Sequence, residues 1–95
     1  MLFRNALGEV LKESRLSQEK TLRTVSKDAF MALGYLSEVE RGQKELSSEP
    51  MENLARALGM DSCEVVFKAA MKMAGVEVPN SPAEILDGYP ESMLR

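Results

Sequence analysis

Residues 21–42 carry the pattern that decides the fold, and they read TLRTVSKDAFMALGYLSEVERG. Apolar side chains recur at helical spacing over 22–29 and again over 33–41, with only three residues between the two sets. Thr21 is placed to cap the first helix, and Gly42 is placed to end the second. The stretch therefore predicts two short helices joined by a tight turn.

Three further helices are expected around this pair. Apolar spacing predicts a helix over residues 3–14, followed by a connector over 16–20. After a polar loop over 43–48, a second amphipathic segment is expected to end at Gly59. Asp61 and Glu64 have the spacing of a capping box, which predicts a fifth helix over about 62–74.

The chain has 95 residues, which is enough for one hydrophobic core but not for two. The fold class predicted is all-α, a five-helix domain over 1–75 with a helix-turn-helix in its middle. The remaining residues, 76–95, are expected to form a C-terminal tail with a short helix over about 82–87.

Composition argues against an enzyme. The chain has no histidine and a single cysteine, Cys63, so no intramolecular disulfide is possible and the usual zinc sites are excluded. No acid–base, metal or phosphate-loop constellation is present, and we expect neither a catalytic site nor a cofactor. Cys63 stands in an apolar segment and is expected to be a small buried or interface residue.

No apolar run approaches the roughly 18 residues needed to span a bilayer. The first residues, MLFRN, lack the apolar region of a signal peptide. A cytoplasmic protein is therefore expected.

The net charge of −3 is unevenly distributed along the chain. Residues 1–60 hold nine Lys or Arg and nine Asp or Glu, whereas 61–95 hold three basic residues and six acidic ones. The acidity therefore lies in the C-terminal third, and a neutral N-terminal part is free to present a basic face.

The segment Tyr35-Leu36-Ser37-Glu38-Val39-Glu40-Arg41-Gly42 resembles the Tyr-Ile-Ser-x-x-Glu-Arg-Gly ending of the helix-turn-helix in the Xre/Cro/lambda-repressor-like family. A second match is the segment Leu54-Ala55-Arg56-Ala57-Leu58-Gly59, and the resemblance covers about residues 4–68. Within that family, residues 33–49 look closest to the actinobacterial Clp gene regulators (ClgR-like), which are dimeric activators of Clp protease genes. The resemblance implies a bacterial, sequence-specific DNA-binding transcription regulator.

In such a protein the second helix of the pair enters the major groove, with its inner side packed on the domain and its outer side facing the bases. We expect Tyr35, Leu36 and Val39 to point inward. The residues expected to face DNA are Arg23, Ala32, Leu33, Gly34, Ser37, Glu38, Arg41 and Lys44. Of these, Arg23 and Lys44 are expected to bind phosphates. The resemblance gives Glu40 a structural part, as a local salt bridge or cap.

The sequence departs from the wider family pattern in three respects. Phe30 stands where the turn usually has a glycine, so this turn must be strained, differently built, or stabilised by burial of the ring. Ala32 replaces a Ser-type cap. Leu33 and Gly34 leave the outer face poor in hydrogen-bonding groups, so specificity is expected to depend partly on DNA shape.

The fifth helix predicts a homodimer, because it carries more apolar side chains than one core-facing side requires. The expected interface residues are Val65, Val66, Ala69, Ala70 and Met73. A tail that folds back over this helix is the alternative, and a tail that joins the dimer interface is a third arrangement. A dimer would bind pseudo-palindromic half-sites about one helical turn apart.

The partners expected are therefore double-stranded DNA, a second copy of the chain and RNA polymerase, with no membrane. Two other functions stay open on the same fold. One is a protein-interaction adaptor or anti-repressor that has lost DNA binding. The other is an antitoxin-type repressor whose C-terminal part holds a toxin.

Overall fold

The structure is a computed structural model and describes residues 1–76, in which five helices and no strand are present. They are α1 (Phe3–Ser17), α2 (Leu22–Asp28), α3 (Leu33–Glu40), α4 (Ser48–Ala57) and α5 (Ser62–Met73). The all-α, five-helix prediction is confirmed. The helix expected over 82–87 and the rest of the tail lie outside the described residues.

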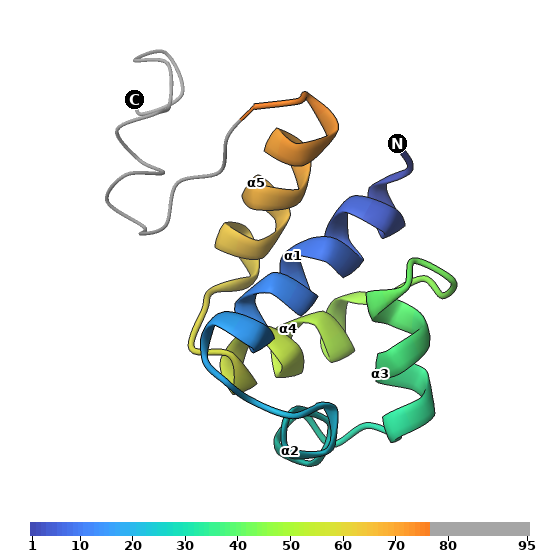
Figure 1. Cartoon of the computed structure of the whole chain (residues 1–95), viewed down its shortest axis with the longest axis vertical. Coiled ribbons are helices and arrows are strands. Elements are labelled where there is room, and N and C mark those ends of the chain that lie inside the picture. The colour runs from blue at the N-terminus through green and yellow to red at the C-terminus, as the bar shows by residue number, and fades with distance from the viewer. Residues whose placement is uncertain (77–95) are drawn as a thin grey trace.

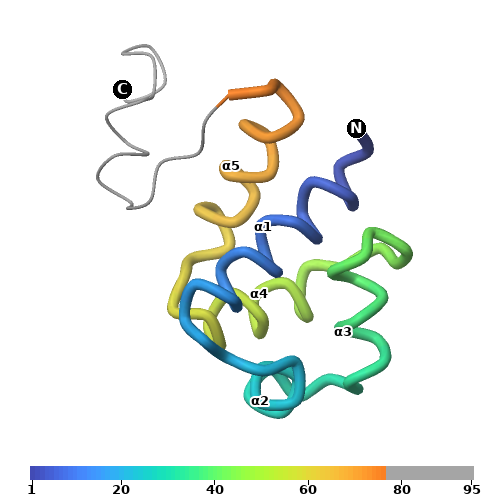
Figure 2. The backbone as a smooth tube through the Cα atoms, viewed as in Figure 1, coloured from blue at the N-terminus to red at the C-terminus, as the bar shows by residue number. Residues whose placement is uncertain are grey.

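Helix α1 lies between α5 on one side and the α2–α3 pair on the other, while α4 contacts both α2 and α5 (Figure 1). The tube view shows how short the connection between α2 and α3 is (Figure 2). All five helices contribute to one core, whose largest fully buried side chains are Leu11, Val25, Leu36, Val39, Leu54 and Val65. Each of these residues lies on the apolar side of its helix, which is why the periodicity could predict the helices.

All five helices end in the same way. The residue after the cap has a positive φ. Its own amide N–H and that of the following residue donate to carbonyls of the last turn, which is the Schellman arrangement. Gly42, Gly59 and Gly75 occupy this left-handed position, as their places in the sequence predicted. Glu19 and Phe30 occupy it after α1 and α2.

Helix α1 extends to Ser17 and is longer than the sequence predicted. Leu16 breaks the apolar pattern and is 54% exposed, but the helix runs through it to Ser17. The inward-facing residue of this last turn is Arg15, which is buried. A charged residue gives no hydrophobic signal, so the periodicity underestimated this helix.

The helix starts agree only in part with the predicted caps. The side chain of Thr21 accepts a hydrogen bond from the Thr24 amide at 3.1 Å, as expected. The prediction of a capping box at the start of α5 is wrong: Asp61 is the N-cap residue, but its side chain forms no capping hydrogen bond. Glu64 instead lies 3.4 Å from the ammonium of Lys68, one turn further along the helix.

Candidate nucleic-acid interface

Helix α3 is held by its inner side and exposed on its outer side. Leu36 and Val39 are each 1% exposed, and Tyr35 is half-buried with its hydroxyl donating to the carbonyl of Glu45 at 2.8 Å. These contacts hold the helix and the start of the following loop against the domain. The predicted inward orientation of the three side chains agrees with this packing.

A buried ion pair joins the end of α3 to α1. The Arg15 guanidinium donates from Nε to Oε2 of Glu40 at 2.7 Å and from Nη2 to Oε1 at 3.0 Å. Its Nη1 donates to the carbonyl of Lys20 at 2.9 Å. The two side chains of the pair are only 10% and 5% exposed. Such two-point pairing fixes direction as well as distance, so the angle of α3 on the domain is tied to α1.

The pair also affects the protonation of its cation. The hydrogen bonds to Glu40 raise the pKa of Arg15 above its ordinary value, because they outweigh the loss of hydration on burial. Glu40 thus has the structural part that the family resemblance implied. Its partner is not local, however, since it lies 25 residues earlier in the chain.

A glycine allows α1 and α3 to approach closely. A Cβ atom on Gly8 would lie 2.5 Å from the Val39 carbonyl oxygen and 2.6 Å from that of Glu40. Both obstacles are backbone atoms, so a side chain at position 8 would push α3 away. Gly8 was not singled out from the sequence, where nothing marks it as a contact between helices.

The expected DNA-facing residues lie on the exposed side of this unit. Ala32, Leu33, Gly34 and Arg41 are exposed, and Ser37 and Glu38 are partly exposed. Arg23 on α2 and Lys44 in the loop after α3 are also exposed. In the free protein the Arg41 Nε lies along its own helix, donating to the Ser37 carbonyl at 3.3 Å.

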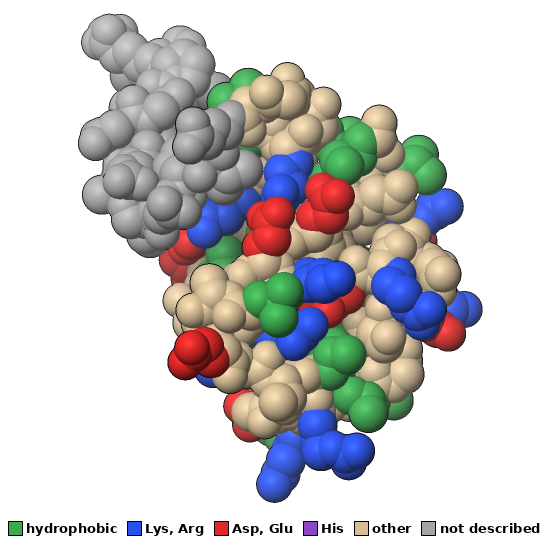
Figure 3. All heavy atoms as spheres, in the orientation of Figure 1, with side chains coloured by type: hydrophobic (Ala, Val, Ile, Leu, Met, Phe, Trp, Pro, Cys, Tyr) green, Lys and Arg blue, Asp and Glu red, His purple; other side chains and the backbone are tan. Residues whose placement is uncertain are grey.

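Four exposed cations without acidic partners lie on α2, at the end of α3 and in the loop after it. Lys12 of α1 and Arg56 of α4 are two further exposed cations without an ion pair among residues 1–76. Within residues 1–76, Arg23, Lys27, Arg41 and Lys44 form no ion pair, whereas the cations of α5 are paired with carboxylates. Figure 3 shows Lys and Arg side chains at the α2 end of the molecule and beside the loop after α3, whereas acidic and basic side chains are mixed over α1 and α5. Lys27 was not identified from the sequence, although it follows Arg23 by four residues and so shares its helix face.

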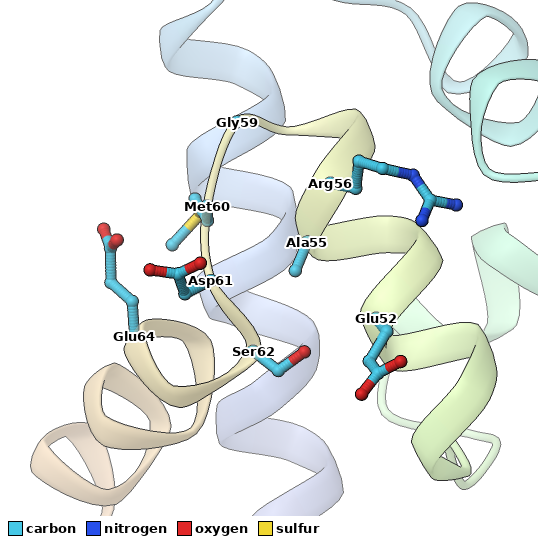
Figure 4. A pocket seen from close by; sticks show the side chains of 8 residues that line it. All are labelled: Glu52, Ala55, Arg56, Gly59, Met60, Asp61, Ser62 and Glu64. Carbon is cyan, nitrogen blue, oxygen red and sulfur yellow. The ribbon is translucent and has the colours of Figure 1, made fainter.

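An open hollow of about 610 Å³ lies on another part of the described surface, between the end of α4 and the start of α5 (Figure 4). Glu52, Asp61 and Glu64 contribute carboxylates to its lining, and Arg56 points away from the latter two. No residue of α2 or α3 lines it. Its excess of negative charge does not suit a phosphate backbone.

Helix α5 corrects part of the predicted dimer interface. Val65 and Ala69 are 0% exposed and belong to the domain core, so they have no surface left for a partner. Val66, Ala70 and Met73 are exposed on the opposite side of the helix. Cys63, expected to be buried or at an interface, is exposed in the single chain.

No helix within residues 1–76 has the length and apolar character that crossing a membrane requires. The same residues contain no group of three or more potential metal ligands drawn from His, Cys, Asp and Glu.

Comparison with known proteins places this geometry among transcription regulators. The transcriptional regulator ClgR of Mycobacterium tuberculosis (strain H37Rv) is 46% identical over 76 residues, which span 80% of this chain and 68% of that protein. The crystal structure of the clp gene regulator ClgR from Corynebacterium glutamicum has a TM-score of 0.75 at 42% identity, covering 78% of this chain and 79% of that one. The restriction-modification controller protein C.AhdI from Aeromonas hydrophila has a TM-score of 0.64 at 27% identity, covering 65% and 94%. No family model matches the sequence.

Proposed function

This chain belongs to the ClgR family of transcriptional regulators, and we propose from that membership that it binds operator DNA with α3 in the major groove. The observation that supports this most directly is the two-sided character of α3. Its inner side is locked by Leu36, Val39 and the buried Glu40, while its outer side stays open. A groove-binding helix needs this combination.

The residues divide into two roles. The first turn of α3, with Leu33 and Gly34, together with Ser37 and Arg41, faces the base edges, where Leu33 contacts thymine methyl groups and Arg41 reaches a guanine or a phosphate. The unpaired cations Arg23, Lys27 and Lys44 bind phosphates on either side of the groove. These three side chains set position and affinity rather than sequence.

We propose that the protein acts as a homodimer through the outer face of α5. Val66, Ala70 and Met73 follow one another at spacings of four and three residues and form an apolar stripe. Val76, at 50% exposure, extends the stripe beyond the helix. The described part of the chain leaves this stripe exposed, and a symmetric partner would bury it.

Its relatives from Corynebacterium glutamicum are described as clp gene regulators, and we propose the same target genes for this chain. In this proposal it acts in the cytoplasm, binds RNA polymerase at the promoter and catalyses no reaction.

Selection of bound duplexes from a random pool tests the proposal. The recovered site should be pseudo-palindromic, with half-site centres about 34–36 Å apart. Log affinity for that site should fall linearly with log salt, because bound phosphates release counterions. No binding at low salt would refute the function.

Two arginine variants then locate the surface. Arg41→Ala should weaken binding to the selected duplex by roughly 5- to 100-fold, the effect of losing one base or phosphate contact. Arg56→Ala is the matched control, because it removes another exposed arginine, on α4 beside the acidic hollow. Equal effects of the two changes would exclude α3 as the recognition helix.

A further inference from the structure

Phe30, in the turn between α2 and α3, has two features that are unfavourable for folding. Its φ is +57°, in the left-handed region that glycine adopts without strain and a residue with a Cβ does not. Its side chain is 81% exposed, the largest exposure among the large hydrophobic residues that the structure describes as exposed. Of the other four helices, three end with glycine at the equivalent position, and α1 ends with Glu19, whose side chain is polar.

The fold itself gives no reason for a phenylalanine here. The turn is an ordinary Schellman ending, with the Phe30 amide donating to the Lys27 carbonyl at 3.2 Å and the Met31 amide donating to the Ser26 carbonyl at 2.9 Å. Glycine would form the same two hydrogen bonds without strain. The exposed ring buries little apolar surface, so it does not offset the backbone cost. Residues held in such a backbone conformation cluster at functional sites.

The position of Phe30 indicates that purpose. It stands three residues before Leu33, the first residue of α3, which is itself 39% exposed. Exposed Lys27 lies three residues earlier on α2 and has no acidic partner among residues 1–76. The exposed ring is thus close in sequence to an unpaired cation and to the first turn of α3. This setting suits the edge of a duplex better than an apolar protein surface.

We propose that Phe30 contacts DNA, with its ring against an apolar edge of the operator. Two parts of a duplex offer such an edge, the C5 methyl group of thymine and the carbons of deoxyribose. The inference rests on the proposed function, because it requires α3 to enter the groove. It adds a residue that reads or positions DNA from the turn rather than from the helix.

Two variants separate the ring from the backbone. Phe30→Ala removes the ring and keeps a residue with a Cβ at positive φ, whereas Phe30→Gly removes the ring and the strain together. Both should bind the duplex selected by the wild-type protein about tenfold more weakly, the loss expected when a contact of this apolar area disappears. Phe30→Gly should also raise Tm by a few degrees, which shows that weaker binding does not come from unfolding.

The two kinds of apolar edge are told apart by replacing each thymine of the selected duplex with deoxyuridine. If the ring contacts a methyl group, one replacement weakens wild-type binding about three- to fourfold and has no effect on Phe30→Ala. If both variants bind weakly but no replacement matters, the ring contacts deoxyribose.

The inference is overturned if both variants bind the duplex within twofold of the wild type. If they bind normally but fail to support transcription by purified RNA polymerase, the ring contacts protein and the DNA assignment is wrong. Arg41→Ala, measured in parallel, distinguishes failure of this inference from failure of the proposed function. Weak binding by Arg41→Ala with normal binding by both Phe30 variants refutes this inference alone, whereas a wild-type protein that binds no duplex refutes the proposed function as well.

Discussion

Replacing Glu40 with alanine should destabilise the domain more than any exposed substitution on α3, because it leaves the Arg15 guanidinium buried without its counterion. The change removes two charge-assisted hydrogen bonds, of 2.7 Å and 3.0 Å, from side chains that are 10% and 5% exposed. Breaking a buried pair from one side typically costs about 3–5 kcal/mol. Arg15 keeps its bond to the Lys20 carbonyl, so we expect the lower part of that range, about 3 kcal/mol.

A loss of this size is large for such a small domain. At roughly 0.05–0.15 kcal/mol per residue, the free energy of unfolding of the 76 described residues is on the order of 4–11 kcal/mol. At roughly 4–8 °C per kcal/mol, Tm should fall by on the order of 12–24 °C. Urea unfolding followed by circular dichroism at 222 nm measures the loss of free energy, and heating followed at the same wavelength measures Tm, since the described fold is helical.

A double-mutant cycle tests the reasoning itself. If the pair acts as argued, Arg15→Ala and Glu40→Ala should each be severe, and the double variant should be much less destabilised than the sum of the two. A coupling energy below about 0.5 kcal/mol would mean that the two side chains act independently. That result, or a loss of less than about 1 kcal/mol for Glu40→Ala, would refute the assigned role of the pair.

Three other predictions test the close approach of α1 and α3, the proposed dimer interface and the protonation of Arg15. Gly8→Ala should lower both the free energy of unfolding and the affinity for DNA, because its Cβ would lie 2.5 Å and 2.6 Å from two backbone carbonyl oxygens of α3. Gly34→Ala has no atom within 4 Å of the new Cβ, so it should raise the free energy of unfolding by up to about 1 kcal/mol. It should still weaken DNA binding, because Gly34 lies in the proposed recognition surface. Val66→Asp should give a folded monomer in sedimentation experiments. Val65→Asp should give an unfolded chain, since only this change places a charge in the core. A dimeric Val66→Asp protein would exclude the proposed interface. Because the pKa of Arg15 is raised in the folded protein, its stabilising contribution is fully present below the pKa that arginine has in the unfolded chain, and it is lost only in strong alkali. The loss of unfolding free energy caused by Arg15→Ala should therefore be the same at about pH 6 and about pH 9. A cost that changes between these two values would show that another titrating group controls the pair.

The amino-acid sequence by itself determined the positions of the helices, the apolar side of most of them, and the family. These are local properties: Leu36 and Val39 repeat at helical spacing, and Gly42 ends its helix because a left-handed residue is favourable there. The segment from Tyr35 to Gly42 was specific enough to identify the family. The same local signals predicted which side of α3 is packed on the domain and which side is exposed.

Only the tertiary structure decided which side of α5 faces the core. Apolar residues surround most of that helix, so the sequence pattern has no clear direction, and the prediction assigned Val65 and Ala69 to a partner although α1 and the core bury them. The partner of Glu40 was equally inaccessible, because Arg15 lies 25 residues away and a charge gives no sign that it will be buried. Whether the ring of Phe30 is buried or exposed also depended on what surrounds the turn in space. Periodicity reports which residues share a side of a helix, but the direction of that side is set by contacts between residues far apart in the chain.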